Sequence, residues 1–110
     1  AELERVKNLC TSPEKHIVVP LNLEHHQALA NQALSVWEEY GPIDILINNA
    51  GLGYFGSLEE MPLEQWQEMF DTNVHGIFYC CREVIPGMKK QQLGHIINIS
   101  SKCAVVIFFI

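Results

Sequence analysis

Three short apolar runs punctuate the chain. They cover residues 16–23 (HIVVPLNL), 43–50 (IDILINNA) and 95–101 (HIINISS), and in each the apolar residues are nearly continuous rather than alternating. Runs of this length and β-branched composition are typical of strands that are covered on both faces, as in parallel sheets. We therefore predict three buried strands.

A helix is predicted in each interval between these strands. Residues 24–41 carry apolar side chains at helical spacing and end before a proline. A longer helix is expected over 62–90, because its opening proline suits a first helical turn, with fraying at the Pro-Gly pair of positions 86–87. Residues 1–9 resemble the tail of a further helix. The apolar stripe of the longer helix consists of Leu63, Trp66, Phe70, Val74, Ile77, Cys81, Val84 and Met88.

Strands and helices that alternate in this way predict an α/β fold, with helices layered over a parallel sheet. The sequence contains no repeat, low-complexity segment or linker, so residues 1–110 are interpreted as a single domain. Hydrophobic residues make up 48% and charged residues 18%, which are the proportions of a globular protein.

Charge, cysteine and histidine content exclude several classes of function. A net charge of −6 leaves no basic surface for nucleic acid or acidic lipid. The four cysteines form no C-x-x-C pair, which favours reduced thiols over disulfides, and the five histidines lack chelating spacings, so no metal site is expected. No signal peptide opens the chain, and the closing AVVIFFI stretch is too short to span a bilayer. We expect a cytoplasmic location, unless a segment before residue 1 directs the protein elsewhere.

The glycines of GLGYFG (51–56) have the G-x-G-x-x-G spacing of a dinucleotide phosphate loop. Such a loop requires a helix directly behind it, whose free N–H groups face the phosphates. It also requires an acidic residue at the end of the next strand. Here the predicted helix begins late, at Pro62, and no acidic residue falls at the end of a strand at that distance. We therefore interpret this segment as a loop that binds no phosphate.

Polar and small residues follow the end of each predicted strand. They are Asn22, the Asn48–Gly51 segment and the Ser100-Ser101 pair. In parallel sheets, ligands bind outside the carboxyl ends of the strands, and these ends share one edge. Each of these residues also has a purely structural interpretation, since asparagine and glycine form turns and serine caps helices. Their joint placement favours a ligand site.

Three motifs together resemble the short-chain dehydrogenase/reductase family. They are NNAG (48–51), DTNVHG (71–76) and GHIINISS (94–101), in the order and approximate spacing of that family. The resemblance extends from residue 1 to Ser101. It implies a partial Rossmann-like, doubly wound parallel sheet in three α/β/α layers, without the first β-α-β unit and the C-terminal strands. It also implies hydride transfer between a nicotinamide cofactor, NAD or NADP, and an alcohol or carbonyl substrate.

The resemblance assigns one group of residues to the adenosine side of that cofactor. Asn48 would in addition brace neighbouring strands, Asn22 occupies a position where the family usually has an aspartate, and Leu23 would offer its backbone. The implied cofactor-binding residues are Asn22, Leu23, Asn48, Asn49, Ala50 and Gly51.

Two further residues are implied in catalysis. Asn73 corresponds to the active-site asparagine that organises a water in the proton relay. Because it lies beside Val74 on an apolar stripe, its amide is expected to find a protein partner. Ser101 corresponds to the serine that hydrogen-bonds the substrate oxygen, with Ser100 as the alternative.

Two motifs of the family are absent from these residues. No Tyr-x-x-x-Lys occurs, and neither does the glycine-rich TGxxxGxG loop. Hydride transfer to a carbonyl needs a proton donor, which a lysine-activated tyrosine supplies. We therefore expect an incomplete chain that is inactive alone. The alternative is a non-catalytic truncated isoform or remnant that acts, if at all, through helix-mediated association.

The resemblance also bears on strand order and partners. In the doubly wound order, two strands separate 16–23 from 43–50, so these two segments are not expected to pair. Homo-oligomers would form through the helix over 62–90, with Phe78, Tyr79 and Arg82 as candidate contacts. The substrate is a small molecule of unspecified class, and residues 102–110 are either a divergent substrate-loop segment or a foreign end.

Overall fold

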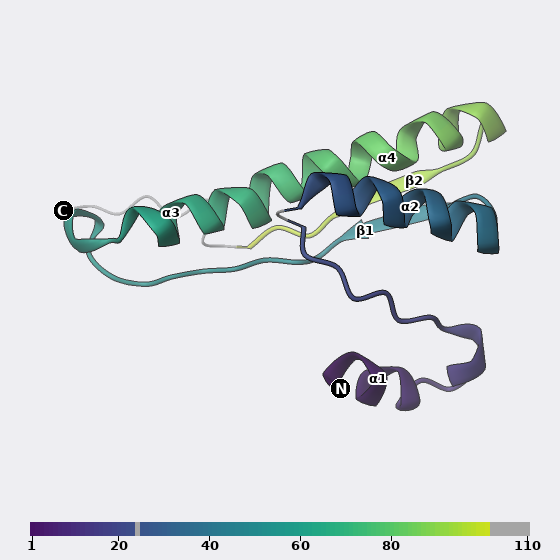
Figure 1. The fold of residues 1–110 in the computed structure, drawn as a ribbon, viewed down its shortest axis with the longest axis horizontal. Coiled ribbons are helices and arrows are strands. Elements are labelled where there is room, and N and C mark those ends of the chain that lie inside the picture. The colour runs from purple at the N-terminus through teal and green to yellow at the C-terminus, as the bar shows by residue number, and fades with distance from the viewer. Residues whose placement is uncertain (24, 102–110) are drawn as a thin grey trace.

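The computed structural model describes residues 1–23 and 25–101, so the tail 102–110 lies outside the described residues. From α2 onward, helices and strands follow the order that the sequence predicts (Figure 1). In chain order the elements are α1 (Glu2–Asn8), the short helix η1 (Pro13–Lys15), α2 (His26–Tyr40), β1 (Ile45–Asn48), the short helix η2 (Leu58–Glu60), α3 (Leu63–Phe70), the π-helical turn η3 (Asp71–His75), α4 (Gly76–Gln91) and β2 (His95–Asn98).

The sheet of the described residues joins β1 and β2 in parallel, with Ile45 opposite His95 and Asn48 opposite Asn98. The connection between the two strands runs through α3 and α4, which makes a β-α-β unit. The prediction of parallel strands within 43–50 and 95–101 is thus confirmed, although each strand is shorter than its apolar run. The expectation that these strands are covered on both faces is wrong, because Ile45, Ile47 and Ile97 are exposed.

Helices α2 and α4 lie side by side over one face of this sheet (Figure 1). The buried apolar residues of the described chain lie on these two helices and are Leu29 on α2 and Val84 and Met88 on α4. Helix α2 ends where Gly41 adopts a φ of 91°, and the Gly41 N–H donates to the carbonyl of Trp37 at 2.9 Å. The predicted Gly-Pro termination of this helix is confirmed.

The predicted helix over 62–90 is interrupted in the structure. A π-helical turn, η3, separates α3 from α4. Beyond it the fraying expected at Pro86 does not occur, because α4 continues to Gln91. A glycine at position 87 allows the ring of Trp37 to lie directly against α4, since a Cβ there would overlap that ring. We attribute the continuity of α4 to this packing, which offsets the hydrogen bond that Pro86 removes.

The prediction of a strand over 16–23 is wrong. These residues form no strand and pair with neither β1 nor β2, and Ile17 and Leu21 are exposed. A strand exists only through hydrogen bonds to a neighbour, and no described segment lies beside this one to provide them. In Figure 1 it runs as an extended connection between η1 and α2, and α1 lies apart from the sheet. The expected absence of pairing with β1 agrees with the structure.

Candidate active site

Asn48, the last residue of β1, connects three elements. Its side chain is buried, and its Nδ2 donates to Oδ1 of Asn98 on β2 at 2.8 Å and to Sγ of Cys81 on α4 at 3.6 Å. Because an amide that is buried without partners is costly, these bonds determine where β1 ends relative to both neighbours. The following residues, Asn49, Ala50 and Gly51, are exposed at the carboxyl end of β1.

Asn73, in η3, holds the segment that follows β1. The Leu52 N–H donates to Oδ1 of Asn73 at 2.8 Å, and Nδ2 of Asn73 donates to the Leu52 carbonyl at 2.7 Å. This is the partner that the sequence requires for an amide on an apolar stripe. The amide also lies beside Gly51, where an added Cβ would stand 3.7 Å from Oδ1. One N–H and one lone pair of the Asn73 amide remain beyond this pair of bonds.

The other candidate residues lie in the segment before α2 and in the segment after β2. Leu23 packs against Gly76 at the start of α4, since a Cβ on Gly76 would lie 3.0 Å from the Leu23 Cβ. The Asn22 carbonyl accepts the His25 N–H at 3.2 Å, ahead of α2. Ser101 is exposed, shortly after the end of β2.

Parallel pairing brings two of these groups to one edge of the sheet. Because Asn48 lies opposite Asn98, the segments that follow, 49–51 and 99–101, leave the sheet together. Asn73 is tied to this edge through Leu52. The two cavities described below are lined by other residues.

The GLGYFG segment leads into no helix N-terminus. The short helix η2 follows it, and α3 begins only at Leu63. Inside the segment, Tyr54 Oη donates to Glu68 at 2.6 Å, which ties the loop to α3. The structure therefore confirms that the α-helix after this segment begins late, whereas the absence of phosphate binding stays a prediction.

Two partners in this region were missed by sequence reasoning. Asn98 and Cys81 both contact the Asn48 amide. The sequence contains a signal for Asn98. ILIN (45–48) and HIIN (95–98) both end in an asparagine, each within a predicted strand. Recognising the pair also requires the strand register, which the sequence does not provide.

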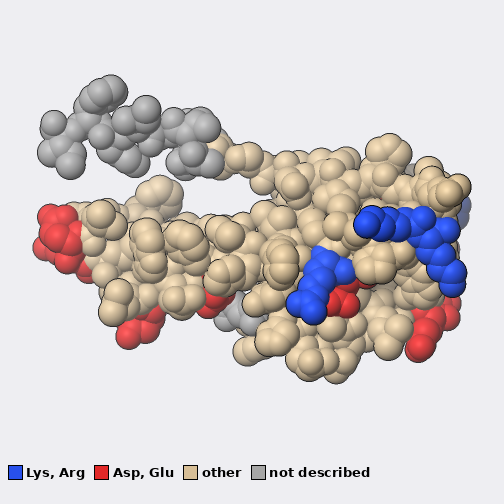
Figure 2. Space-filling view, turned by 90° about the horizontal axis from the view of Figure 1, so that it is seen from above, with Lys and Arg blue, Asp and Glu red and all other residues tan. Residues whose placement is uncertain are grey.

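Charge is distributed unevenly over the molecule. Figure 2 shows acidic side chains at the end formed by η2 and α3, basic side chains over α4, and further acidic side chains close to the basic ones. At the junction of α3 and η3, hydrogen bonds from Gln67 and then from His75 lower the pKa of Asp71 below its ordinary value of 3.8. Burial, followed by the neighbouring Cys81, raises the pKa of the Cys80 thiol.

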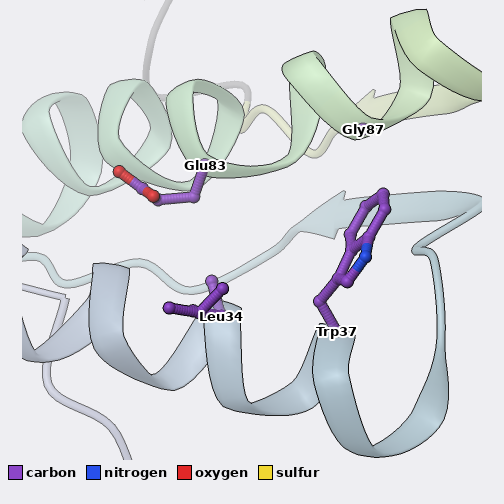
Figure 3. Close-up of a pocket in the computed structure, with 5 residues that line it drawn as sticks. Leu34, Trp37, Glu83 and Gly87 are labelled. Carbon is purple, nitrogen blue, oxygen red and sulfur yellow. The ribbon is translucent and has the colours of Figure 1, made fainter.

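Two cavities lie away from this edge. One, of about 210 Å³, opens between α2 and α4 (Figure 3). The other, of about 580 Å³, is an open groove along α3 beside Trp66 and Asp71. Among the described residues, none of the helices is both long and apolar enough to cross a bilayer, and no cluster of three candidate metal ligands occurs.

A β-α-β unit whose strands end in amides, small residues and serines at one edge is the construction of a nucleotide-binding α/β domain. Comparison with known proteins makes this class specific. The sequence model of the short chain dehydrogenases matches residues 1–109, and the chain belongs to this family.

Relatives and solved structures agree with this membership. The NADP-dependent 3-hydroxy acid dehydrogenase YdfG of Escherichia coli is 39% identical over 85 residues, which are 76% of this chain and 34% of that protein. Serine dehydrogenase from Escherichia coli superposes with a TM-score of 0.84 at 32% identity, over 97% of this chain and 49% of that one. ElxO with NADP bound gives a TM-score of 0.85 at 27% identity, over 96% of this chain and 43% of that one. The chain thus spans about a third of the length of the curated relatives it matches.

Proposed function

We propose that the chain is part of an oxidoreductase that uses NAD or NADP and acts on a small alcohol or carbonyl compound. Membership of the short chain dehydrogenases supports this, as does the NADP named for both YdfG and the ElxO structure. The acidic net charge of −6 offers nothing to a nucleic acid. A cytoplasmic location, with its cysteines reduced, is part of the same proposal.

The exposed edge after β1 fits the adenosine side of such a cofactor. Asn49, Ala50 and Gly51 present a polar side chain, little bulk and open backbone there. Asn22 and Leu23 would approach from the start of α2, where Leu23 is held against Gly76. Asn48 itself is occupied by Asn98 and Cys81, so its role is to position this edge.

The reaction side is assigned to Asn73 and Ser101. The bound nicotinamide would supply or accept the hydride. The exposed Ser101 hydroxyl would hydrogen-bond the reacting oxygen of the substrate, and the remaining N–H and lone pair of the Asn73 amide would hold a water. The observation that carries this assignment is the pair of bonds between Asn73 and Leu52, which fixes an amide from the long helix beside the edge that follows β1.

The 110 residues alone are proposed to be inactive. Serine and asparagine provide no proton donor that titrates towards neutral pH, and Tyr-x-x-x-Lys is absent from the sequence. We expect no saturable change in NADPH fluorescence at micromolar protein. Tight binding there would contradict this part of the proposal.

A non-catalytic role through association has one observation in its favour. Phe78, on α4, is 59% exposed, and Tyr79 lies against it. A homo-oligomer formed over α3 and α4 would cover this surface. Analytical ultracentrifugation of the chain and of Phe78→Ser tests it, because only the former would dimerise.

A chimera tests the oxidoreductase assignment. The segment of YdfG that matches this chain is replaced by the chain's own, which leaves the rest of YdfG unchanged. NADP-dependent turnover is expected, and Ser101→Ala in the chimera should lower kcat/KM at least about a hundredfold. Ser100→Ala is the matched control and should have little effect. Equal activity of both variants would remove Ser101 from the reaction.

A second measurement needs no chimera. Titration of the chain with AMP, followed by NMR, should shift the backbone signals of residues 49–51 and Leu23 most. Shifts confined to α3, or no shifts at millimolar AMP, would contradict cofactor binding at residues 49–51. Such a result would leave the role assigned to Ser101 unaffected.

A further inference from the structure

A cavity between α2 and α4 lies apart from every residue assigned above. It is lined by Ala33, Leu34 and Trp37 of α2 and by Glu83 and Gly87 of α4 (Figure 3). Its volume of about 210 Å³ suits a molecule of a few heavy atoms rather than a dinucleotide.

Trp37 forms the end wall of this cavity. In Figure 3 it stands upright from α2 towards Gly87, and a Cβ on Gly87 would overlap its ring. The indole is therefore held in position by packing. Leu34, one turn earlier along α2, is 59% exposed and extends the apolar floor. An aromatic ring held in this way attracts a cation to its face.

Glu83 supplies the charge of the cavity. Its side chain leaves the side of α4 that faces α2 and then runs along α4, away from Trp37, and the residue is half-buried (Figure 3). Its carboxylate makes no hydrogen bond or ion pair with any described residue. The two ion pairs among the described residues join Arg5 to Glu2 and His75 to Asp71. Arg82 precedes it on α4, but successive residues of a helix point about 100° apart. Among residues 1–23 and 25–101, no lysine or arginine lines the cavity.

A carboxylate from α4, together with a leucine and a fixed indole from α2, makes a lining that is complementary to one class of ligand. We propose that the cavity between α2 and α4 binds a small organic ammonium ion, with the charged nitrogen beside Glu83 and the methyl or methylene groups against Trp37 and Leu34. Anions are repelled by Glu83, and a neutral apolar molecule leaves the carboxylate without a partner. This site is independent of the proposed oxidoreductase activity.

The test is an NMR titration of the full chain with choline. The chain has two tryptophans, so two indole N–H signals are observed, and Trp66→Phe assigns them. The Trp37 signal should shift saturably with a dissociation constant on the order of 1 mM. The Trp66 signal should stay in place, because Trp66 lies on α3 beside the other cavity. Absence of a saturable Trp37 shift overturns the proposal.

Two controls separate charge recognition from apolar contact. The neutral isostere 3,3-dimethyl-1-butanol should bind at least about tenfold more weakly than choline, a comparison that needs no variant. Glu83→Gln should weaken choline binding by a similar factor, whereas Glu60→Gln, in η2, should not. Equal binding of the two ligands, or equal effects of the two substitutions, overturns the proposal by showing apolar binding or general attraction to an acidic chain.

Discussion

At the scale of single residues, two amides organise the edge that follows β1. Nδ2 of Asn48 donates hydrogen bonds to Asn98 and Cys81. The Asn73 amide bonds both the N–H and the carbonyl of Leu52. Each amide supplies hydrogen bonds at a point where the regular bonding of the sheet or of a helix ends. The sequence identified Asn73 as a polar group that needs a partner, and the family resemblance implied that Asn48 braces neighbouring strands. It could not identify the partners, which lie 50 and 21 positions away and are brought near only by strand register and by the turn η3.

The bond between Asn48 and Asn98 is expected to contribute measurably to stability. Asn48→Ala should lower the free energy of unfolding by about 1–3 kcal/mol, because it leaves the Asn98 oxygen without its donor and creates a small cavity. A double-mutant cycle with Asn98→Ala, measured by urea unfolding, should give a coupling of about 1 kcal/mol. Asn49→Ala, one residue on and exposed, should change stability by less than about 0.5 kcal/mol. Additive effects of the pair would show that the bond contributes nothing.

At the scale of elements, apolar periodicity located most of the helices and strands, and it failed in two places. It predicted α2, β1, β2 and a long second helix, because each buries one face or both. It wrongly predicted a strand over 16–23. The composition of a segment indicates a tendency to be extended, but it does not indicate whether another strand lies beside the segment to pair with it. It also missed η3, because a π turn depends on the contact between Asn73 and Leu52 rather than on local propensity.

Packing between α2 and α4 depends on the glycine at position 87. Gly87→Ala should improve helix propensity by about 1 kcal/mol, yet the new methyl group would overlap the Trp37 ring. We expect net destabilisation by about 1–3 kcal/mol in urea unfolding. Gly53→Ala is the matched control, since a Cβ there meets nothing within 4 Å. A more stable Gly87→Ala variant would mean that Trp37 moves away at no cost.

The junction of α3 and η3 should respond to acid. Because hydrogen bonds lower the folded-state pKa of Asp71, their contribution to stability is present above the unfolded value of 3.8 and is lost as the pH falls through the folded pKa. Titration of the carboxyl carbon by NMR should place the midpoint below that of an unfolded peptide. Gln67→Ala and His75→Ala should each raise the midpoint, since both side chains lower the pKa of Asp71. A midpoint unchanged in both variants would show that these contacts do not stabilise the carboxylate.

At the scale of the whole molecule, one face of the sheet is open. Helices cover the face that carries Leu46 and Ile96, whereas Ile45, Ile47 and Ile97 are 57%, 58% and 45% exposed on the other. The radius of gyration of 16.6 Å exceeds the roughly 13 Å typical of a compact domain of this length. A chain that leaves this much apolar strand surface in water is expected to associate.

A charge on the open face should suppress that association. Ile47→Lys should raise the concentration at which light scattering increases, several-fold, with little change in far-UV circular dichroism. Leu46→Lys, on the adjacent strand position but facing the helices, should instead unfold the chain, because it buries a charge. If both variants aggregate like the parent chain, the open face is not the cause.

The turn η3 has a consequence for the whole length of the helix that contains it. A π turn accommodates one residue more than an α turn, so the side chains before and after it are offset by about 100° around the common axis. The apolar residues of α3 therefore face a different direction from those of α4, although the sequence spaces them as a single stripe. Deleting one residue from 71–75 would restore an unbroken 3.6-residue repeat, and the same rotation would carry Asn73 away from the backbone it now holds.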